Sequence, residues 1–157
     1  MMDILVLDVD GVLNSNLDHN TAKNEELIFF GMYAFISKAK LKLLCETFKG
    51  FYVILSSDWR RRPLTMLGIS RLLTENGLYF LSATDTNGPR RSDEIRRALT
   101  FFNYKSAIIL DDLGANEVNP RMPNAIFHQV DFQVGFTEED ADKINSLIRQ
   151  YKRGIII

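Results

Sequence analysis

The sequence predicts an α/β fold in which a mainly parallel five-stranded sheet is flanked by helices. Apolar runs of strand length alternate along the chain with segments of helical period, which is the pattern of βαβ units. No internal repeat or low-complexity linker interrupts this pattern, so we expect one domain over residues 1–157. A hydrophobic fraction of 46% and a charged fraction of 25% are typical of a water-soluble globular domain.

The expected elements follow from apolar runs and from helix start and stop signals. The five strands cover residues 4–8, 52–55, 78–81, 106–110 and 125–128. The helices cover residues 33–48 and 65–76, a segment capped by Ser92 that runs to 102, and a last segment capped by Thr137. Residues 14–33 carry Asn-rich turns and are expected to be irregular. The apolar end at 154–157 fits core packing, an edge strand or a subunit contact.

Charge and cysteine content exclude several classes of protein. The net charge of −1 gives no overall field that would attract nucleic acid or an anionic membrane. Two local basic clusters, Arg60-Arg61-Arg62 and Arg90-Arg91, fit a solvated surface or a nucleic-acid contact. The single Cys45 excludes an internal disulfide and a multi-cysteine zinc site. No apolar run approaches a membrane span, so we expect no membrane partner and a cytoplasmic location.

Two carboxylates one residue apart follow the first strand. Asp8 and Asp10 are followed at once by Gly11, and residues i and i+2 of an extended segment share a face. Two acids beside an apolar strand repel each other unless a cation or a shared proton offsets the repulsion. The alternative is a structural carboxylate that caps the following turn. A ligand site at the carboxyl end of a central strand fits the open α/β sheet.

Three of the five expected strands end in polar groups suited to one phosphate site. The first ends at Asp8 and Asp10, the second at Ser56, and the fourth at Asp111 and Asp112. Because parallel strands bring their carboxyl ends to one edge of the sheet, we expect these groups to converge.

These residue types fit phosphoryl transfer through a covalent aspartate. Asp8 is the expected nucleophile, and Asp10 is expected to protonate the leaving oxygen and later to deprotonate water. An anionic phosphate needs a hard cation beside these acids, and Mg²⁺ prefers oxygen ligands. We expect Asp8, the backbone carbonyl of Asp10 and Asp111 to form part of its shell. Asp112 fits contact with the metal through water or a role in orienting Asp111.

A hydroxyl and a cation are expected to hold the phosphate. Ser56 would donate its hydroxyl to a phosphate oxygen, with Ser57 beside it as a further substrate-binding residue; the alternative is a serine that caps a turn. Arg91, just before the Ser92-capped helix, is the best-placed cation. Arg90 is its competitor, and Lys105 is a weaker one.

In this order, the residues resemble the haloacid dehalogenase (HAD) superfamily of aspartate-dependent phosphohydrolases. Residues 8–12 resemble its first motif, 53–56 its second and 108–112 its acidic fourth motif. Arg91 would fill the third motif, where lysine is usual. Dehalogenases of the superfamily typically lack the second acid, so the presence of Asp10 favours a phosphatase. The resemblance implies a HAD-like Rossmannoid fold and covers nearly the whole chain.

A narrower resemblance concerns HAD domains associated with RNA repair proteins. It rests on the segment 55–60, Leu-Ser-Ser-Asp-Trp-Arg, and on Asp131 followed by Gly135-Phe136-Thr137. The gaps between motifs leave no room for a large cap domain, which implies an open cleft. Such a cleft would admit nucleotides, protein phosphosites or polynucleotide ends.

Two functional hypotheses of different class follow. The first is a Mg²⁺-dependent phosphatase, with nucleotide or nucleic-acid end phosphates as one substrate class. The second is a non-catalytic binding or regulatory module on the same scaffold. Trp59 fits either stacking on a base or packing at the rim of the core, and His128 fits a structural role. His19, Asn16 and Asn20 fit solvated loop positions or contacts to substrate.

Overall fold

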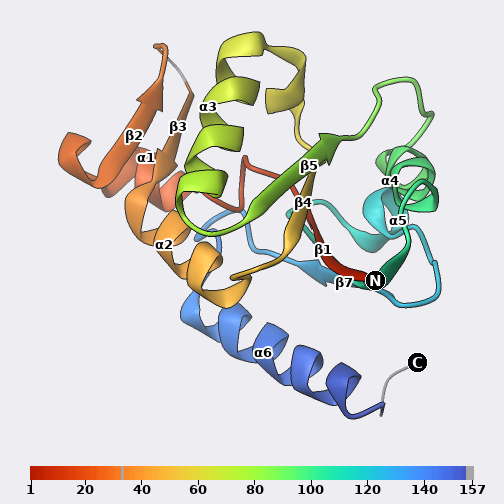
Figure 1. Cartoon of the computed structure of the whole chain (residues 1–157). Helices are drawn as coiled ribbons and strands as arrows, with labels where there is room; N and C mark the ends of the chain where they lie inside the picture. Colours follow the sequence, from red (N-terminus) through yellow and green to blue (C-terminus); the bar gives the residue numbers. More distant parts are fainter. Residues whose placement is uncertain (33, 155–157) are drawn as a thin grey trace.

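The computed structural model describes residues 1–32 and 34–154, and it contains a five-stranded sheet between two layers of helices (Figure 1). The strands run in the spatial order β5-β4-β1-β6-β7, and every pairing between them is parallel. Their bounds are Met2–Leu7 for β1, Tyr52–Leu55 for β4, Tyr79–Ala83 for β5, Tyr104–Asp111 for β6 and Ala125–Gln129 for β7. The predicted α/β architecture with a parallel five-stranded sheet is confirmed.

Side chains of the central strands alternate between two apolar cores. In β1, Leu5 and Leu7 belong to one cluster, whereas Ile4 and Val6 belong to the other, and all four are fully buried. A strand that is buried on both faces carries a continuous apolar run. This explains why residues 4–7 contain no polar side chain.

Five helices cover the two faces of the sheet. Those that contribute buried side chains to the first core are α2 (Lys38–Thr47), α3 (Pro63–Glu75) and α6 (Glu138–Lys152). The opposite face is covered by α4 (Arg91–Thr100) and the short α5 (Ala115–Val118). Figure 1 shows α4 and α5 together on one side and α2, α3 and α6 on the other.

The segment between β1 and β4 holds a hairpin that the sequence analysis does not predict. The expected irregular stretch contains α1 (Asn16–Thr21), a 3₁₀ turn η1 (Asn24–Glu26) and strand β2 (Leu27–Phe30). Strand β3 (Ala34–Ser37) pairs antiparallel with β2. The predicted helix over 33–48 is therefore wrong in its first turn, because Phe35 and Ile36 belong to β3 and the helix begins at Lys38.

Other boundaries differ from the prediction by a few residues. Helix α4 begins at Arg91 and its N-cap position is Arg90, so Ser92 lies inside the first turn and is not the cap. Thr137 does cap α6, where its hydroxyl accepts a hydrogen bond from the Asp140 amide. The question of how the apolar end packs concerns residues 155–157, which lie outside the described residues.

Among the described helices, none combines the length and the apolar character that a membrane crossing requires. The longest, α6, carries acidic residues in its first turn and basic residues in its last.

Candidate active site

The backbone ladder continues one residue beyond the strands and positions the first residue of each loop. The Asp8 amide donates to the Leu110 carbonyl at 3.0 Å, and the Ser56 amide donates to the Leu7 carbonyl at 2.8 Å. The Thr84 amide likewise donates to the Leu55 carbonyl at 2.9 Å. Asp8, Ser56 and Thr84 therefore lie at the same edge of the sheet, on three neighbouring strands.

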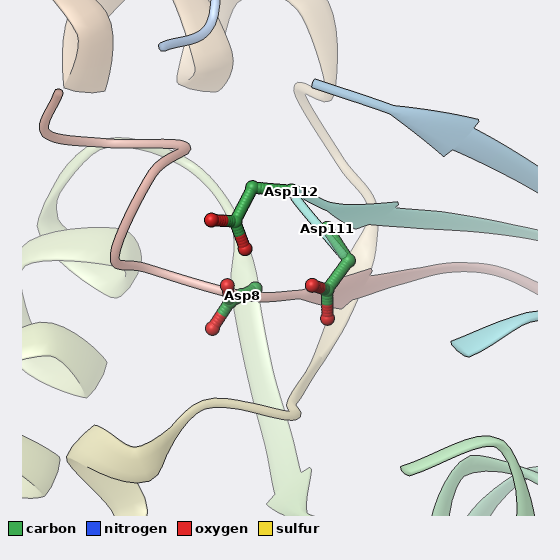
Figure 2. A group of neighbouring side chains, drawn as sticks. All are labelled: Asp8, Asp111 and Asp112. Atoms are coloured by element: carbon green, nitrogen blue, oxygen red, sulfur yellow. The ribbon is translucent and has the colours of Figure 1, made fainter. Parts of the chain in front are cut away.

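Three carboxylates meet at this edge, from the ends of β1 and β6 (Figure 2). Asp8, Asp111 and Asp112 each offer an oxygen, and these oxygens lie within 4.8 Å of one another. Asp8 is 4% exposed and Asp111 is 1% exposed, whereas Asp112 is half-buried. The expected convergence of acids from separate strands therefore occurs for these three side chains.

Arg91 places a positive charge against two of these acids. Its Nη1 donates to Asp111 Oδ2 at 2.7 Å and lies 3.6 Å from Asp8 Oδ1. The side chain is 17% exposed, so the guanidinium reaches into the cluster from the start of α4 while one edge faces solvent. A single guanidinium nitrogen thus lies against both acids, and its positive charge offsets part of their repulsion.

Burial and mutual repulsion disfavour the charged forms of the two buried acids. Burial above all, together with the negative charge of Asp111, raises the pKa of Asp8 well above its ordinary value, although Arg91 opposes the shift. Burial also raises the pKa of Asp111, against the effect of Arg91 and of the Leu113 amide. For Arg91, burial lowers the pKa, but the charges of Asp8 and Asp111 outweigh it and the net shift is upward. A further cation next to Asp8 and Asp111 would therefore be bound favourably.

The turn after Asp8 requires glycine at position 11. Gly11 has a φ of +79°, and a Cβ at this position would lie 2.5 Å from Asp112 Oδ2. The missing side chain therefore lets the Asp112 carboxylate approach the turn. The Gly11 amide donates to Asn14 Oδ1 at 2.9 Å, which closes the turn on itself.

Asp10 lies beside the cluster rather than within it. Its Oδ1 accepts hydrogen bonds from Trp59 Nε1 at 3.0 Å and from Asn14 Nδ2 at 2.9 Å, and the residue is exposed. Trp59 is 5% exposed and packs edge-on against Phe30, with ring centroids 5.2 Å apart. Of the two alternatives for Trp59, the structure therefore supports packing, and it adds a role that the sequence analysis missed: holding Asp10.

Ser56, which lies at this edge of the sheet, has a buried hydroxyl without a hydrogen-bond partner among the described residues. Within residues 1–32 and 34–154, Ser56 Oγ and Thr84 Oγ1 are the two buried side-chain polar atoms that make no hydrogen bond. A buried hydroxyl normally finds a partner, so an unpaired one suits a ligand atom. Ser57 differs, because its hydroxyl accepts from the Trp59 amide and caps η2 (Asp58–Arg61). Substrate binding by Ser57 stays a prediction, and its observed role is structural.

The competitors of Arg91 lie elsewhere. Arg90 is exposed and lines a separate cavity with Ser92 and Asp93. Lys105 is near the amino end of β6, six residues before Asp111, which at about 3.3 Å per residue is roughly 20 Å from the acids. Of the three cations that the sequence offers, Arg91 is the one in contact with the acids.

The first arginine of the basic cluster is not available to a ligand. Arg60 is 4% exposed and pairs with Glu94, 7% exposed, at 2.9 Å. Its guanidinium also donates to the carbonyls of Ser57 and Thr84. The suggestion that the whole Arg60-Arg61-Arg62 cluster contacts nucleic acid is therefore wrong for Arg60, whose role is to join η2 to α4. Arg61 and Arg62 are exposed and line a cavity of about 550 Å³ with Asp10 and Trp59.

The residues at the strand ends fit a divalent cation. All donors are oxygens, Asp8 and Asp111 come from adjacent strands, and Asp112 completes a three-carboxylate group that Mg²⁺ commonly binds together with waters. The sequence analysis left the role of Asp112 open, and the structure brings this side chain into the cluster. The backbone carbonyl of Asp10 as a further ligand stays a prediction.

An all-parallel sheet with an aspartate directly after its central strand is consistent with a small HAD-like Rossmannoid domain, and residues 1–32 and 34–154 contain no large cap domain. The family model described as the HAD domain in Swiss Army Knife RNA repair proteins matches residues 4–141, and the chain belongs to this family. Both resemblances drawn from the motifs are thereby confirmed. HAD domains are generally phosphatases and typically use Mg²⁺, which agrees with the acidic cluster. Neither the curated proteins nor the solved structures include a significant match to the chain.

The buried ion pair between Arg60 and Glu94 predicts that Arg60 contributes to stability, whereas its neighbour Arg61 does not. Arg60→Ala is expected to lower the free energy of unfolding by about 3–5 kcal/mol, because Glu94 is then buried without its partner. Arg61→Ala is the matched control, since the Arg61 side chain is 52% exposed, and should change stability by less than about 0.5 kcal/mol. Urea denaturation measures both, and equal stabilities of the two variants would contradict the structural role of Arg60.

Proposed function

We propose that the protein is a Mg²⁺-dependent phosphomonoester hydrolase in which Asp8 forms an aspartyl-phosphate. The observation that carries this proposal is the group of Asp8, Asp111 and Asp112 at one sheet edge, with Arg91 against two of the acids. Burying like charges together costs free energy, and a cation bound in a catalytic centre offsets that cost.

In the first step, Asp8 attacks phosphorus. A bond forms between an Asp8 carboxylate oxygen and phosphorus, and the bond from phosphorus to the leaving oxygen breaks. Asp10 donates a proton to that leaving oxygen, so an alcohol departs. The hydrogen bonds from Trp59 and Asn14 both reach Asp10 Oδ1, which assigns the transferred proton to Oδ2.

In the second step, Asp10 acts as a base. It removes a proton from a water molecule whose oxygen attacks the phosphorus of the aspartyl-phosphate. The bond between phosphorus and Asp8 breaks, inorganic phosphate leaves, and both acids return to their starting states.

The remaining residues neutralise and orient the phosphate. Mg²⁺, held by Asp8, Asp111 and Asp112, would supply positive charge that lets a carboxylate approach an anionic phosphate. Arg91 would contact the phosphate oxygens that develop charge, and the unpaired Ser56 hydroxyl would donate to another. A hydroxyl donor and a guanidinium on opposite sides would align phosphorus with Asp8.

We further propose that the phosphate lies at a polynucleotide end. The family of RNA repair proteins supports this substrate class. Arg61 and Arg62 line the cavity next to Asp10 and are exposed, so they could contact the phosphodiester chain that follows the terminal phosphate. Within residues 1–32 and 34–154 no large cap domain covers the acids, which fits a bulky substrate.

Asp8→Asn tests the reaction directly. The variant is expected to lose turnover of an aryl phosphate in the presence of Mg²⁺, because the amide is not a nucleophile. Its fold should persist. Because burial raises the pKa of Asp8 in the folded state, an ionised Asp8 lowers the free energy of unfolding at neutral pH, and the neutral side chain does not. The melting temperature of metal-free Asp8→Asn at pH 7 should therefore equal or exceed that of wild type.

The control for this variant is Asp142→Asn, an exposed acid on α6 whose loss should leave turnover unchanged. Near-normal phosphate release by a folded Asp8→Asn would overturn the proposed reaction. So would the failure of Mg²⁺ to stimulate release by wild type across sugar, nucleotide and oligonucleotide phosphates.

Arg91→Ala is expected to lower kcat/KM by about 10²–10³, as the loss of one electrostatic donor does elsewhere. Arg91→Lys should recover part of the rate, because an ammonium keeps the charge but not the fork. The matched control is Arg90→Ala, which removes the neighbouring exposed cation and should stay close to wild type. Steady-state assays on one aryl phosphate compare all three, and a larger loss in Arg90→Ala would assign the phosphate contact to Arg90.

The nucleic-acid part of the proposal predicts a dependence on salt. Wild type should prefer a phosphorylated oligonucleotide over the mononucleotide, and the preference should fall as salt rises. The double variant Arg61→Ala/Arg62→Ala should reduce the slope of log kcat/KM against log salt by roughly 1–2. The matched control is Arg71→Ala/Arg149→Ala, which removes two arginines from α3 and α6 instead. Equal slopes for wild type and Arg61→Ala/Arg62→Ala would contradict the contact.

A further inference from the structure

A second cavity borders the acids. Its volume is about 330 Å³, and Asp10 and Asp112 are among the residues that line it. His19, Phe35 and Phe132 line it as well and give it aromatic walls. We call these three side chains, together with the cavity between them, the aromatic groove. Asp10 lines both this groove and the cavity that contains Arg61 and Arg62.

The rings of the groove come from three segments that are far apart in the sequence. His19 lies on α1 and Phe35 on β3, and their rings stack with centroids 6.2 Å apart and planes 18° apart. Phe132 comes from the loop after β7 and is 47% exposed. Exposed aromatic faces on different elements of one cavity provide stacking surfaces for a planar group.

Hydrogen bonds connect the backbone at Phe35 and Phe132 to the segment that follows β1. Asn14 Nδ2, which contacts Asp10, also donates to the Phe35 carbonyl at 2.9 Å. The Asn16 amide donates to the Phe132 carbonyl at 3.2 Å, and the Leu17 amide donates to the Gln133 carbonyl at 3.0 Å. These bonds hold the backbone of the groove next to the segment that carries Asp10, so little backbone ordering is required when a ligand binds.

The chemistry around the acids favours one kind of occupant. Two cavities share Asp10 as a lining residue: aromatic side chains line one, and two exposed arginines line the other. A nucleotide carries a planar base and a phosphodiester at different positions of its sugar, and Asn16, whose Nδ2 donates to Gln133 Oε1 at 3.2 Å, also lines the groove. A phosphorylated sugar would leave the rings unused.

We propose that the aromatic groove binds the nucleobase of the terminal, phosphorylated nucleotide, with Phe132 as the main stacking surface. This inference rests on the proposed function, because it takes Asp8 as the point where the terminal phosphate reacts. The protein would then recognise the base of the terminal nucleotide as well as its phosphate.

The test compares two oligonucleotides phosphorylated at the end that wild type hydrolyses, one with a terminal base and one with an abasic terminal sugar. Wild type should hydrolyse the substrate with the base with a higher kcat/KM, by roughly 5- to 100-fold, as expected for one stacked base. Phe132→Ala should remove most of this difference by slowing the substrate with the base and leaving the abasic one unchanged. Phe132→Trp should keep it, because the indole also offers a π-face.

Phe101→Ala is the matched control, since Phe101 is an exposed phenylalanine at the far end of α4 and should not alter the preference. Equal rates for the two substrates with wild type would overturn the inference without any variant. Equal losses on both substrates in Phe132→Ala would also overturn it, because the ring would then act on the fold. Acetyl phosphate, which has no base, checks the proposed function separately: Asp8→Asn should lose its hydrolysis whatever the groove binds.

Discussion

The structure depends on the burial of two carboxylates at adjacent strand ends. Asp8 and Asp111 are held there by the parallel ladder between β1 and β6, so the distance between them is set by the sheet rather than by their own preference. Arg91 offsets only part of the cost of burying these charges and of their repulsion, because the pKa values of both acids remain raised. The first turn of α4 places Arg91 beside these acids. The glycine at position 11 lets the Asp112 carboxylate approach the turn after Asp8.

Local patterns were sufficient to predict the sheet and most of this cluster. A strand buried on both faces needs a continuous apolar run, and the polar residue that follows marks its end within a residue or two. The order of Asp8, Ser56 and Asp111 along the chain therefore predicts their convergence without any knowledge of the loops. Arg91 could be chosen because it directly precedes a helical segment whose start must lie at the same sheet edge.

The rest depends on contacts between distant segments. Two apolar runs around Gly31 are a hairpin signal, but the helical period after residue 33 competes with it, and only the pairing of β2 with β3 decides between them. Arg60 looks like its neighbours in the sequence, and its burial follows from Glu94, 34 residues later. Asp112 and Ser57 are similar cases, since a turn geometry and a cap determine where their side chains point.

On the proposed function, the lack of a large cap in the described residues changes how the general acid Asp10 is oriented. A large cap would exclude water and align an acid as it closes, whereas this chain holds Asp10 from the side by the Trp59 indole and the Asn14 amide. Asn14 also fixes the Phe35 carbonyl, and Trp59 packs on Phe30 of the hairpin. The small hairpin therefore supports both side chains that hold Asp10, through the Phe35 carbonyl and the Phe30 ring. On the proposed function, these fixed contacts orient the general acid, as closure of a large cap would do.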